Sequence, residues 1–278
     1  MKKISIIGCG AIGSELALSI DSEMVDKVKI SSLFDLNLEY AENLRSILKN
    51  NSPELYGNFS DYVNSKSFKE VDLVIESASQ EAVKAYIRKI LSERKDILVM
   101  SVGSFADSNF YADILKYVAK YENNIYVPSG AIAGIDAIKS TRNFISSVTL
   151  TTTKNPESLR GAPFFQTSQI DLDSLKKRTI IFEGSAVEAV KYFPANVNVA
   201  ALLGLVGLGV EKTKVNIVVD PSIRINKHEI KVTGKFGELI IMVKNIPSSK
   251  NPRTSYLAIL SALECIRSIV SSGLKYGT

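Results

Sequence analysis

Residues 2–13 read KKISIIGCGAIG. Apolar and small side chains predict a short buried strand, which Gly8, Gly10 and Gly13 follow directly, before a helix-like stretch at residues 14–20. A strand, a glycine turn and a helix start in this order are typical of a dinucleotide site. Gly8 permits the sharp turn, Gly10 lets the backbone approach a pyrophosphate, and Gly13 lets the helix pack close to the strand. The N-terminus of the helix then offers free N–H groups and a positive dipole end to the phosphates.

A carboxylate stands where such a site needs one, at the end of the second predicted strand. Asp35 follows Gly13 by 22 residues. It is expected to accept hydrogen bonds from the adenosine ribose and to repel a 2′-phosphate. The next two residues supply no arginine for that phosphate, so the sequence predicts NAD, with NADP as the alternative. A simple turn or cap role for Asp35 is the other interpretation. The expected cofactor-binding set also includes Ala11, Ile12 and Ala78.

Composition bounds the class of protein. Hydrophobic residues make up 45% and charged residues 23% of the 278 residues, with a net charge of +5. The basic residues do not gather into an aromatic-laced stripe, so no nucleic-acid partner is expected. One histidine and two distant cysteines, Cys9 and Cys265, predict no metal site and no disulfide scaffold. No signal peptide and no apolar run of about 18 residues is found, which predicts a cytoplasmic protein without a membrane partner.

Strand and helix signals alternate over residues 1–128, which predicts a Rossmann-type, doubly wound parallel sheet. After residue 128 the pattern changes, and residues 129–250 predict a second α+β domain with a mostly antiparallel sheet. Residues 234–237 predict a hairpin, and residues 195–207 a helix packed on this sheet. The C-terminal segment, residues 251–278, contains an apolar helix that is expected to pack back on the first domain. The strands expected in the second domain are at residues 146–153, 179–182, 215–219, 229–233 and 239–243.

His228 is the only histidine in the chain. In an extended strand it shares one face with Ile230 and Val232, so the imidazole is expected to point inward. Imidazole is the side chain best suited to proton transfer near neutral pH. A buried, hydrogen-bonded structural histidine is the alternative, and pattern alone does not decide between the two.

Several segments, in order along nearly the whole chain, go beyond general pattern. The chain resembles the L-aspartate dehydrogenase family of the de novo NAD-biosynthesis branch. The glycine motif is shared by many folds, whereas NVNVAA, NKH and NPRTS are far more specific. The segments that carry the resemblance are IGCGAIG (7–13), VIESAS (74–79), SVG (101–103), PSGAIAGIDA (128–137), FEGSA (182–186), FPANVNVAA (193–201), DP (220–221), NKH (226–228) and NPRTS (251–255).

The resemblance implies NAD(P)-dependent oxidative deamination of L-aspartate to iminoaspartate, or the reverse amination of oxaloacetate. It implies that His228 is the active-site residue and that Ala131 and Asn198 contact the cofactor. It also implies a homodimer and supports the packing of the last helix on the cofactor domain. The chain departs from the family pattern at Ser77 and Lys227, neither of which puts the chemistry in doubt.

A dicarboxylate substrate needs cationic or N–H donors. The candidates are Lys154, Arg253 and the backbone of residues 129–131, although Lys and Arg are more often solvated surface charges. Asn196 is a further substrate candidate or a helix cap. Asn226 is expected to fix the His228 tautomer or to close a turn. In this scheme neutral His228 takes the proton of the substrate amine before hydride leaves.

Other functions are alternatives. A homoserine-type dehydrogenase or a dihydrodipicolinate-type reductase has the same two-domain plan. A non-catalytic NAD(H)-sensing regulator would need an output module such as a basic recognition helix, and the sequence contains no such pattern. A pseudoenzyme is disfavoured by the glycine motif together with His228.

Overall fold

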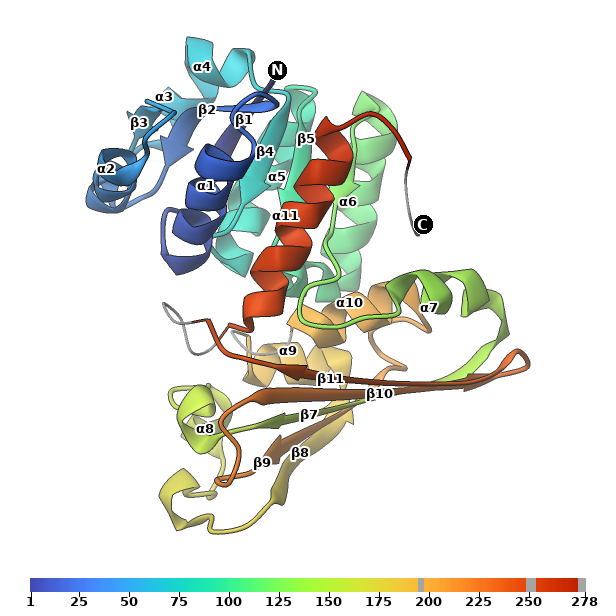
Figure 1. The fold of residues 1–278 in the computed structure, drawn as a ribbon. Helices are drawn as coiled ribbons and strands as arrows, with labels where there is room; N and C mark the ends of the chain where they lie inside the picture. The colour runs from blue at the N-terminus through green and yellow to red at the C-terminus, as the bar shows by residue number, and fades with distance from the viewer. Residues whose placement is uncertain (195–197, 249–253, 275–278) are drawn as a thin grey trace. The chain divides into compact units, whose positions relative to one another are not determined.

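The computed structural model describes residues 1–194, 198–248 and 254–274. The chain divides into two compact units (Figure 1). The first contains Met1–Ser104, Ser108–Pro128 and the C-terminal helix from Ile259 on, and the second contains Phe105–Asp107 and Ser129–Ala258. Within the described ranges, no helix has the length and apolar character needed to cross a membrane.

The first unit is a six-stranded sheet of order β3-β2-β1-β4-β5-β6, and every strand pair in it is parallel. The order reverses between β1 and β4, so the carboxyl ends of these two strands flank the switch point where ligands bind in such sheets. The predicted Rossmann-type sheet is therefore confirmed. Its strands are β1 Lys2–Ile7, β2 Val28–Phe34, β3 Glu54–Tyr56, β4 Leu73–Glu76, β5 Asp96–Val99 and β6 Ile125–Tyr126.

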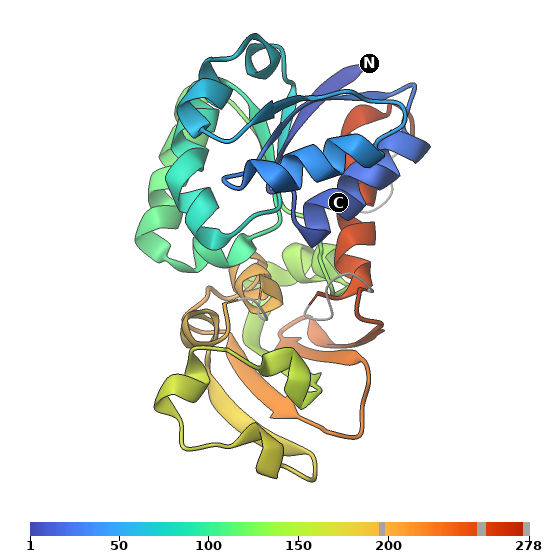
Figure 2. The ribbon, with the colours of Figure 1, turned by 90° about the vertical axis from the view of Figure 1, so that its left-hand side faces the viewer.

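Helices cover both faces of this sheet (Figures 1 and 2). On one face α1, α2 and α11 share a core with β1, in which Leu16, Leu44 and Leu263 are buried. On the other face Phe34 stacks on Tyr62. The helices around this sheet are α1 Ala11–Glu23, α2 Leu38–Ile47, α3 Phe59–Asn64, α4 Lys66–Lys69, α5 Gln80–Ser92, η1 Val102–Ala106, α6 Ser108–Tyr121 and α11 Tyr256–Val270.

The second unit is a five-stranded sheet of order β11-β10-β7-β9-β8. Three of its four strand pairs are antiparallel, and β7 with β9 is parallel. The predicted mostly antiparallel sheet is confirmed, and Gly234 pairs with Gly237 across the predicted hairpin. Its strands are β7 Ile145–Lys154, β8 Thr179–Ser185, β9 Lys214–Val219, β10 Asn226–Gly234 and β11 Gly237–Asn245.

Helices of the second unit cover one face of its sheet (Figure 1). A Cβ placed on Gly207, just after α10, would lie 3.3 Å from Val148 of β7, which shows how closely the two pack. The helix predicted for residues 195–207 is found, over its described residues, as α10, whereas α9 before it was not predicted. The capping box of Ser185 and Glu188 starts α9 and was readable in the sequence. The helical segments are α7 Ile135–Thr141, η2 Arg142–Phe144, η3 Pro156–Leu159, α8 Phe164–Thr167, η4 Leu172–Ser174, α9 Ala186–Tyr192 and α10 Asn198–Val206.

Candidate active site

The glycine turn joins β1 to α1 and needs its glycines for different reasons. Gly8 has a φ of +89°, and a Cβ there would lie 2.7 Å from Ala78. A Cβ on Gly13 would lie 1.9 Å from the carbonyl oxygen of Gly8, so α1 approaches the turn more closely than any side chain permits. A Cβ on Gly10, the N-cap of α1, would meet no atom within 4 Å. The turn thus leaves open space at the first N–H groups of α1, which fits a pyrophosphate.

Asp35 lies directly after β2 and is tied to the glycine turn. Its Oδ2 accepts a hydrogen bond from Cys9 N at 2.7 Å, and its Oδ1 accepts one from Asn37 N at 2.9 Å. A carboxylate offers about four lone-pair positions, so both oxygens can still accept from a ribose. Burial and the Asp35 charge raise the pKa of the Cys9 thiol to about 12, which keeps it a thiol at neutral pH. Asp35 therefore stabilises the turn, and its carboxylate can still accept hydrogen bonds from a ribose.

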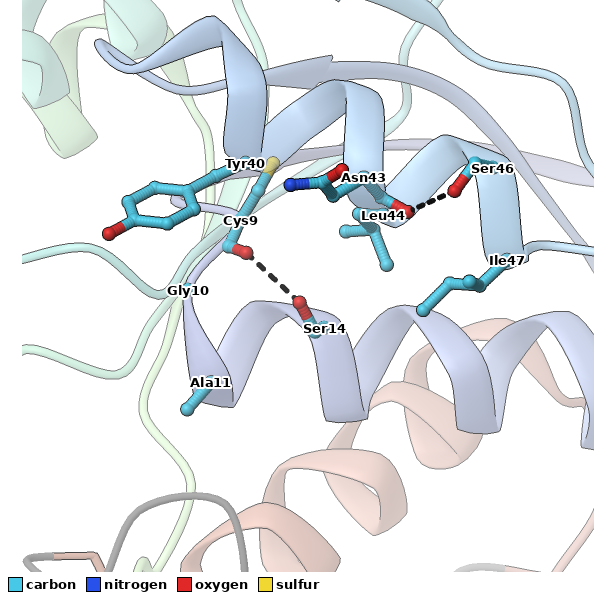
Figure 3. Close-up of a pocket in the computed structure, with 9 residues that line it drawn as sticks. All are labelled: Cys9, Gly10, Ala11, Ser14, Tyr40, Asn43, Leu44, Ser46 and Ile47. Carbon is cyan, nitrogen blue, oxygen red and sulfur yellow. Dashed lines mark hydrogen bonds between the residues drawn. The ribbon is translucent and has the colours of Figure 1, made fainter.

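An open pocket of about 410 Å³ lies beside the glycine turn, between α1 and α2. Figure 3 shows Cys9 and Ser14 joined by a hydrogen bond on one side, with Tyr40 and Asn43 reaching from α2 on the other. None of the residues that line this pocket is Lys or Arg.

The β4–α5 turn closes over the glycine turn. Ser77 Oγ donates to the carbonyl oxygen of Gly8 at 2.9 Å, so this serine ties the two turns together. Ala78 N donates to Oε1 of Glu76 at 2.8 Å. The Ser79 side chain caps the N-terminus of α5 by accepting a hydrogen bond from Ala82 N. The elements around the switch point are thus linked by hydrogen bonds.

In the second unit, polar side chains gather at one end of the sheet face that is apolar elsewhere. They come from the end of β7, the start of β10 and the end of β11, which lie side by side in the sheet. Each is no more than 4% exposed. Along the same face Leu150, Ile230 and Val232 are buried and apolar. We call the following five residues the polar end: Thr152, Lys154, Asn226, His228 and Asn245.

His228 is 2% exposed and points to the inward face with Ile230, as predicted. Its Nδ1 lies 3.0 Å from Oγ1 of Thr152, its register partner on β7. Burial and the nearby Lys154 charge lower the pKa of the imidazole to about 3. The ring is therefore neutral at physiological pH, with Nδ1 engaged by Thr152 and Nε2 left for other chemistry.

Lys154 is buried rather than solvated, with 3% exposure. It lies two residues beyond Thr152 on β7 and therefore on the same face as His228. Burial lowers the pKa of its ammonium to about 8. Its burial beside the sole imidazole argues against the alternative that Lys154 is a solvated surface charge.

The two asparagines of the polar end are register partners on β10 and β11. Asn226 Nδ2 donates to Ser255 Oγ at 3.2 Å, whereas the described partner of the His228 ring is Thr152. Asn245 Nδ2 donates to the carbonyl oxygen of Ala131 at 2.7 Å. The loop that carries Ala131 is thereby fastened to the strand end beside His228.

The structure gathers the expected residues in two groups. Gly8, Gly10, Ala11, Ile12, Gly13, Asp35 and Ala78 lie around the turn of the first unit, and Ala131, Lys154, Asn198, Asn226 and His228 belong to the second. Asn198 starts α10. Asn196 and Arg253 lie outside the described residues.

Three further residues of these sites, Thr152, Glu76 and Asn245, were not predicted from the sequence. In each case the only sequence signal is a polar residue at or near the end of a strand. Over the described ranges, no three His, Cys, Asp or Glu side chains gather to hold a metal ion.

Comparisons with known proteins place both units. Residues 136–269 match the family model described as aspartate dehydrogenase, C-terminal, and residues 8–128 match homoserine dehydrogenase, NAD binding domain. The L-aspartate dehydrogenases of Nitrosopumilus maritimus and Methanococcoides burtonii are 43% and 45% identical, each over 100% of both chains. The crystal structure of aspartate dehydrogenase from Thermotoga maritima superposes with a TM-score of 0.76 at 30% identity, covering 99% of this chain and 100% of that one.

More distant structures share the fold alone. GenD2 from gentamicin A biosynthesis, solved with NAD, has a TM-score of 0.56 at 9% identity and covers 99% of this chain and 88% of its own. The full-length relatives, by contrast, share both units and more than a third of their residues with this chain. The chain belongs to the L-aspartate dehydrogenase family.

Proposed function

We propose that the protein catalyses the NAD-dependent oxidative deamination of L-aspartate to iminoaspartate and, in reverse, the amination of oxaloacetate. The observation that carries this proposal is the polar end, where the only histidine is buried and neutral beside a buried lysine. A neutral imidazole and a cation are what a substrate with an ammonium and two carboxylates requires. In this proposal the iminoaspartate feeds NAD biosynthesis.

The glycine turn holds the nucleotide. The open space at Gly10 and the N-terminus of α1 receive the pyrophosphate. Asp35 accepts hydrogen bonds from the adenosine ribose, and Ala131 and Asn198 contact the nicotinamide end. The bound nucleotide supplies one chemical capacity, which is acceptance of a hydride at C4 of its nicotinamide.

His228 acts as the general base. With Nδ1–H donated to Thr152 Oγ1, Nε2 keeps its lone pair and accepts a proton from the substrate ammonium. The substrate nitrogen then has the lone pair that drives hydride from Cα. A base with a pKa of about 3 is weak in the free protein. The two substrate carboxylates bring negative charge that raises this pKa and stabilises the imidazolium.

Lys154 binds one substrate carboxylate. Its ammonium is buried on the His228 face, where a substrate carboxylate would contribute a favourable charge interaction. Asn226, Asn196 and Arg253 are the further proposed contacts of the substrate. Asn245 is proposed to act indirectly, by holding in place the loop of Ala131 through a hydrogen bond to the Ala131 carbonyl oxygen.

Replacing Lys154 by methionine should raise KM for L-aspartate roughly 10²-fold, since a buried charge contact is worth about 2–3 kcal/mol. In the unchanged protein KM should also rise above about pH 8, because the lowered pKa of Lys154 brings its deprotonation into that range. Lys154→Arg should lose this alkaline rise. Steady-state kinetics between pH 6 and 10 measure both effects.

Lys227→Met is the matched control for the lysine experiment. Lys227 is next to His228 but on the opposite face, paired with Glu229 at 3.0 Å. Its replacement should leave KM within about twofold, because exposed ion pairs contribute little. An unchanged KM in Lys154→Met, or an equal rise in the control, would show that Lys154 does not bind substrate.

Replacing Asp35 by alanine should lower the preference for NAD over NADP by about tenfold or more, since it removes repulsion of the 2′-phosphate. The readout is the ratio of kcat/KM values for the two nucleotides. Asn37→Ala is the control, because Asn37 caps α2 without charge, and it should leave the ratio unchanged. A wild-type protein that already uses NADP at least as efficiently would contradict the assignment of Asp35.

The proposed activity is tested with a substrate panel. L-aspartate, L-glutamate, L-alanine and L-homoserine are each mixed with protein and NAD, and the absorbance of reduced nicotinamide is followed. L-aspartate is expected to be strongly preferred. Oxidation of homoserine without oxidation of aspartate would contradict the proposal and indicate a homoserine-type dehydrogenase instead. Residues 8–128 match the family model for the NAD binding domain of homoserine dehydrogenase.

A further inference from the structure

A buried carboxylate stands at the switch point of the first sheet and has no part in the chemistry proposed above. Glu76 is the last residue of β4 and is 2% exposed. Its Oε1 accepts hydrogen bonds from Ala78 N at 2.8 Å and from Ser101 Oγ at 2.9 Å, and its Oε2 accepts one from Ser101 N at 3.0 Å. Burying a carboxylate is costly unless its lone pairs are satisfied, and here three donors satisfy them.

The three donors come from the two turns that follow β4 and β5. Ala78 belongs to the turn before α5, and Ser101 to the turn before η1. The first of these turns also contacts the glycine turn, because Ser77 Oγ donates to Gly8 O and a Cβ on Gly8 would touch Ala78. The Glu76 side chain therefore links both turns to the end of β4.

In a doubly wound sheet of this order, each half binds one mononucleotide, on either side of the switch point. Asp35 belongs to the half built from β1, β2 and β3, which takes the adenosine. The turns that Glu76 holds belong to the half built from β4, β5 and β6. The second half therefore faces the nicotinamide mononucleotide.

We propose that Glu76 is a positioning residue for the nicotinamide half of the cofactor, because it locks the β4–α5 and β5–η1 turns in place. This inference rests on the proposed binding of a pyridine nucleotide by the first unit. Burial raises the pKa of Glu76, and the hydrogen bonds from Ser101 and Ala78 oppose that rise. The donor set fits a carboxylate, since both backbone N–H groups need an acceptor.

Glu76→Gln tests the proposal with almost no change in size. The amide NH₂ must face either Ala78 N–H or Ser101 N–H, so one buried donor loses its acceptor and its turn relaxes. Isothermal titration is expected to give a Kd for NADH about tenfold weaker, with the Kd for ADP changed less than about twofold. ADP reports on the adenosine half, whereas NADH reports on both halves.

Asp21→Asn is the control, because it neutralises another hydrogen-bonded carboxylate of low exposure elsewhere in the same unit. Asp21 is 3% exposed on α1 and accepts from Lys49 N at 2.7 Å and Asn51 Nδ2 at 2.8 Å. It should lower thermal stability without changing either Kd. Ser101→Ala, which removes only the hydroxyl donor, is expected to weaken NADH about threefold and to test the proposal should Glu76→Gln not fold.

Equal loss of NADH and ADP binding in Glu76→Gln, no loss of either, or the same NADH loss in Asp21→Asn would overturn the role of Glu76. A wild-type protein that binds ADP but not NADH gives a different result. It would contradict the proposed cofactor itself, before any variant is compared.

Discussion

Replacing His228 by asparagine should lower kcat for L-aspartate oxidation by about 10²–10⁴-fold, the usual contribution of a positioned general base. Asparagine can keep the hydrogen bond to Thr152 Oγ1, which His228 Nδ1 makes at 3.0 Å, but it cannot take a proton. The Kd for NADH should stay nearly unchanged, because the nucleotide is held by the glycine turn. His228→Ala should give a similar loss of kcat.

The control for this experiment is Thr152→Val, which keeps the imidazole and removes its partner. It should lower kcat much less than His228→Asn does, since the base remains and only its orientation is less restricted. Thermal unfolding of each variant separates loss of chemistry from loss of fold. Near-normal turnover in the His228 variants would leave this residue a buried structural histidine.

Two glycines of the same turn should differ in what their replacement by alanine impairs, which is folding stability for Gly13 and nucleotide binding for Gly10. Gly13→Ala should lower the melting temperature by about 5 °C or more, because its Cβ would lie 1.9 Å from the carbonyl oxygen of Gly8, and overpacking of this kind costs about 1–3 kcal/mol or more. Gly10→Ala should leave the melting temperature within about 1 °C, because its Cβ would meet no atom within 4 Å.

Nucleotide binding gives the second half of the glycine experiment. Gly10→Ala should weaken NADH about tenfold or more, since the new methyl group enters the space assigned to the pyrophosphate. Calorimetry and thermal unfolding on both variants check the prediction. If Gly10→Ala bound NADH like the wild type, the pyrophosphate would have to lie elsewhere.

Much of the fold follows from local sequence signals. The glycine turn follows from the spacing of Gly8, Gly10 and Gly13 between a strand and a helix, and the hairpin pairs Gly234 with Gly237 as predicted. The inward direction of His228 follows from strict alternation with Ile230 and Val232, which are buried on the same face. These features depend on neighbours within a few residues, which is why the sequence predicts them.

The composition of the polar end depends on contacts between distant strands, which no local pattern encodes. Lys154 closes a run of threonines and looks like a solvated charge, yet it is 3% exposed on the sheet face that it shares with His228. Asn245 is 114 residues from the Ala131 carbonyl that it holds. Glu76 ends an apolar strand, and only the fold shows that three donors surround its carboxylate.

The most direct measurement uses L-aspartate carrying deuterium at Cα, with NAD and the wild-type protein, and NMR of the reduced nucleotide. We expect deuterium at C4 of the nicotinamide, because the proposed reaction moves the hydride from Cα of the substrate to that carbon. With His228→Asn, the initial rate of label transfer should be about 10²–10⁴-fold lower, even though that variant still binds NADH. Reduced nucleotide without the label, or label transfer by the His228 variant at the wild-type rate, would show that the proposed hydride transfer or the role of His228 is wrong.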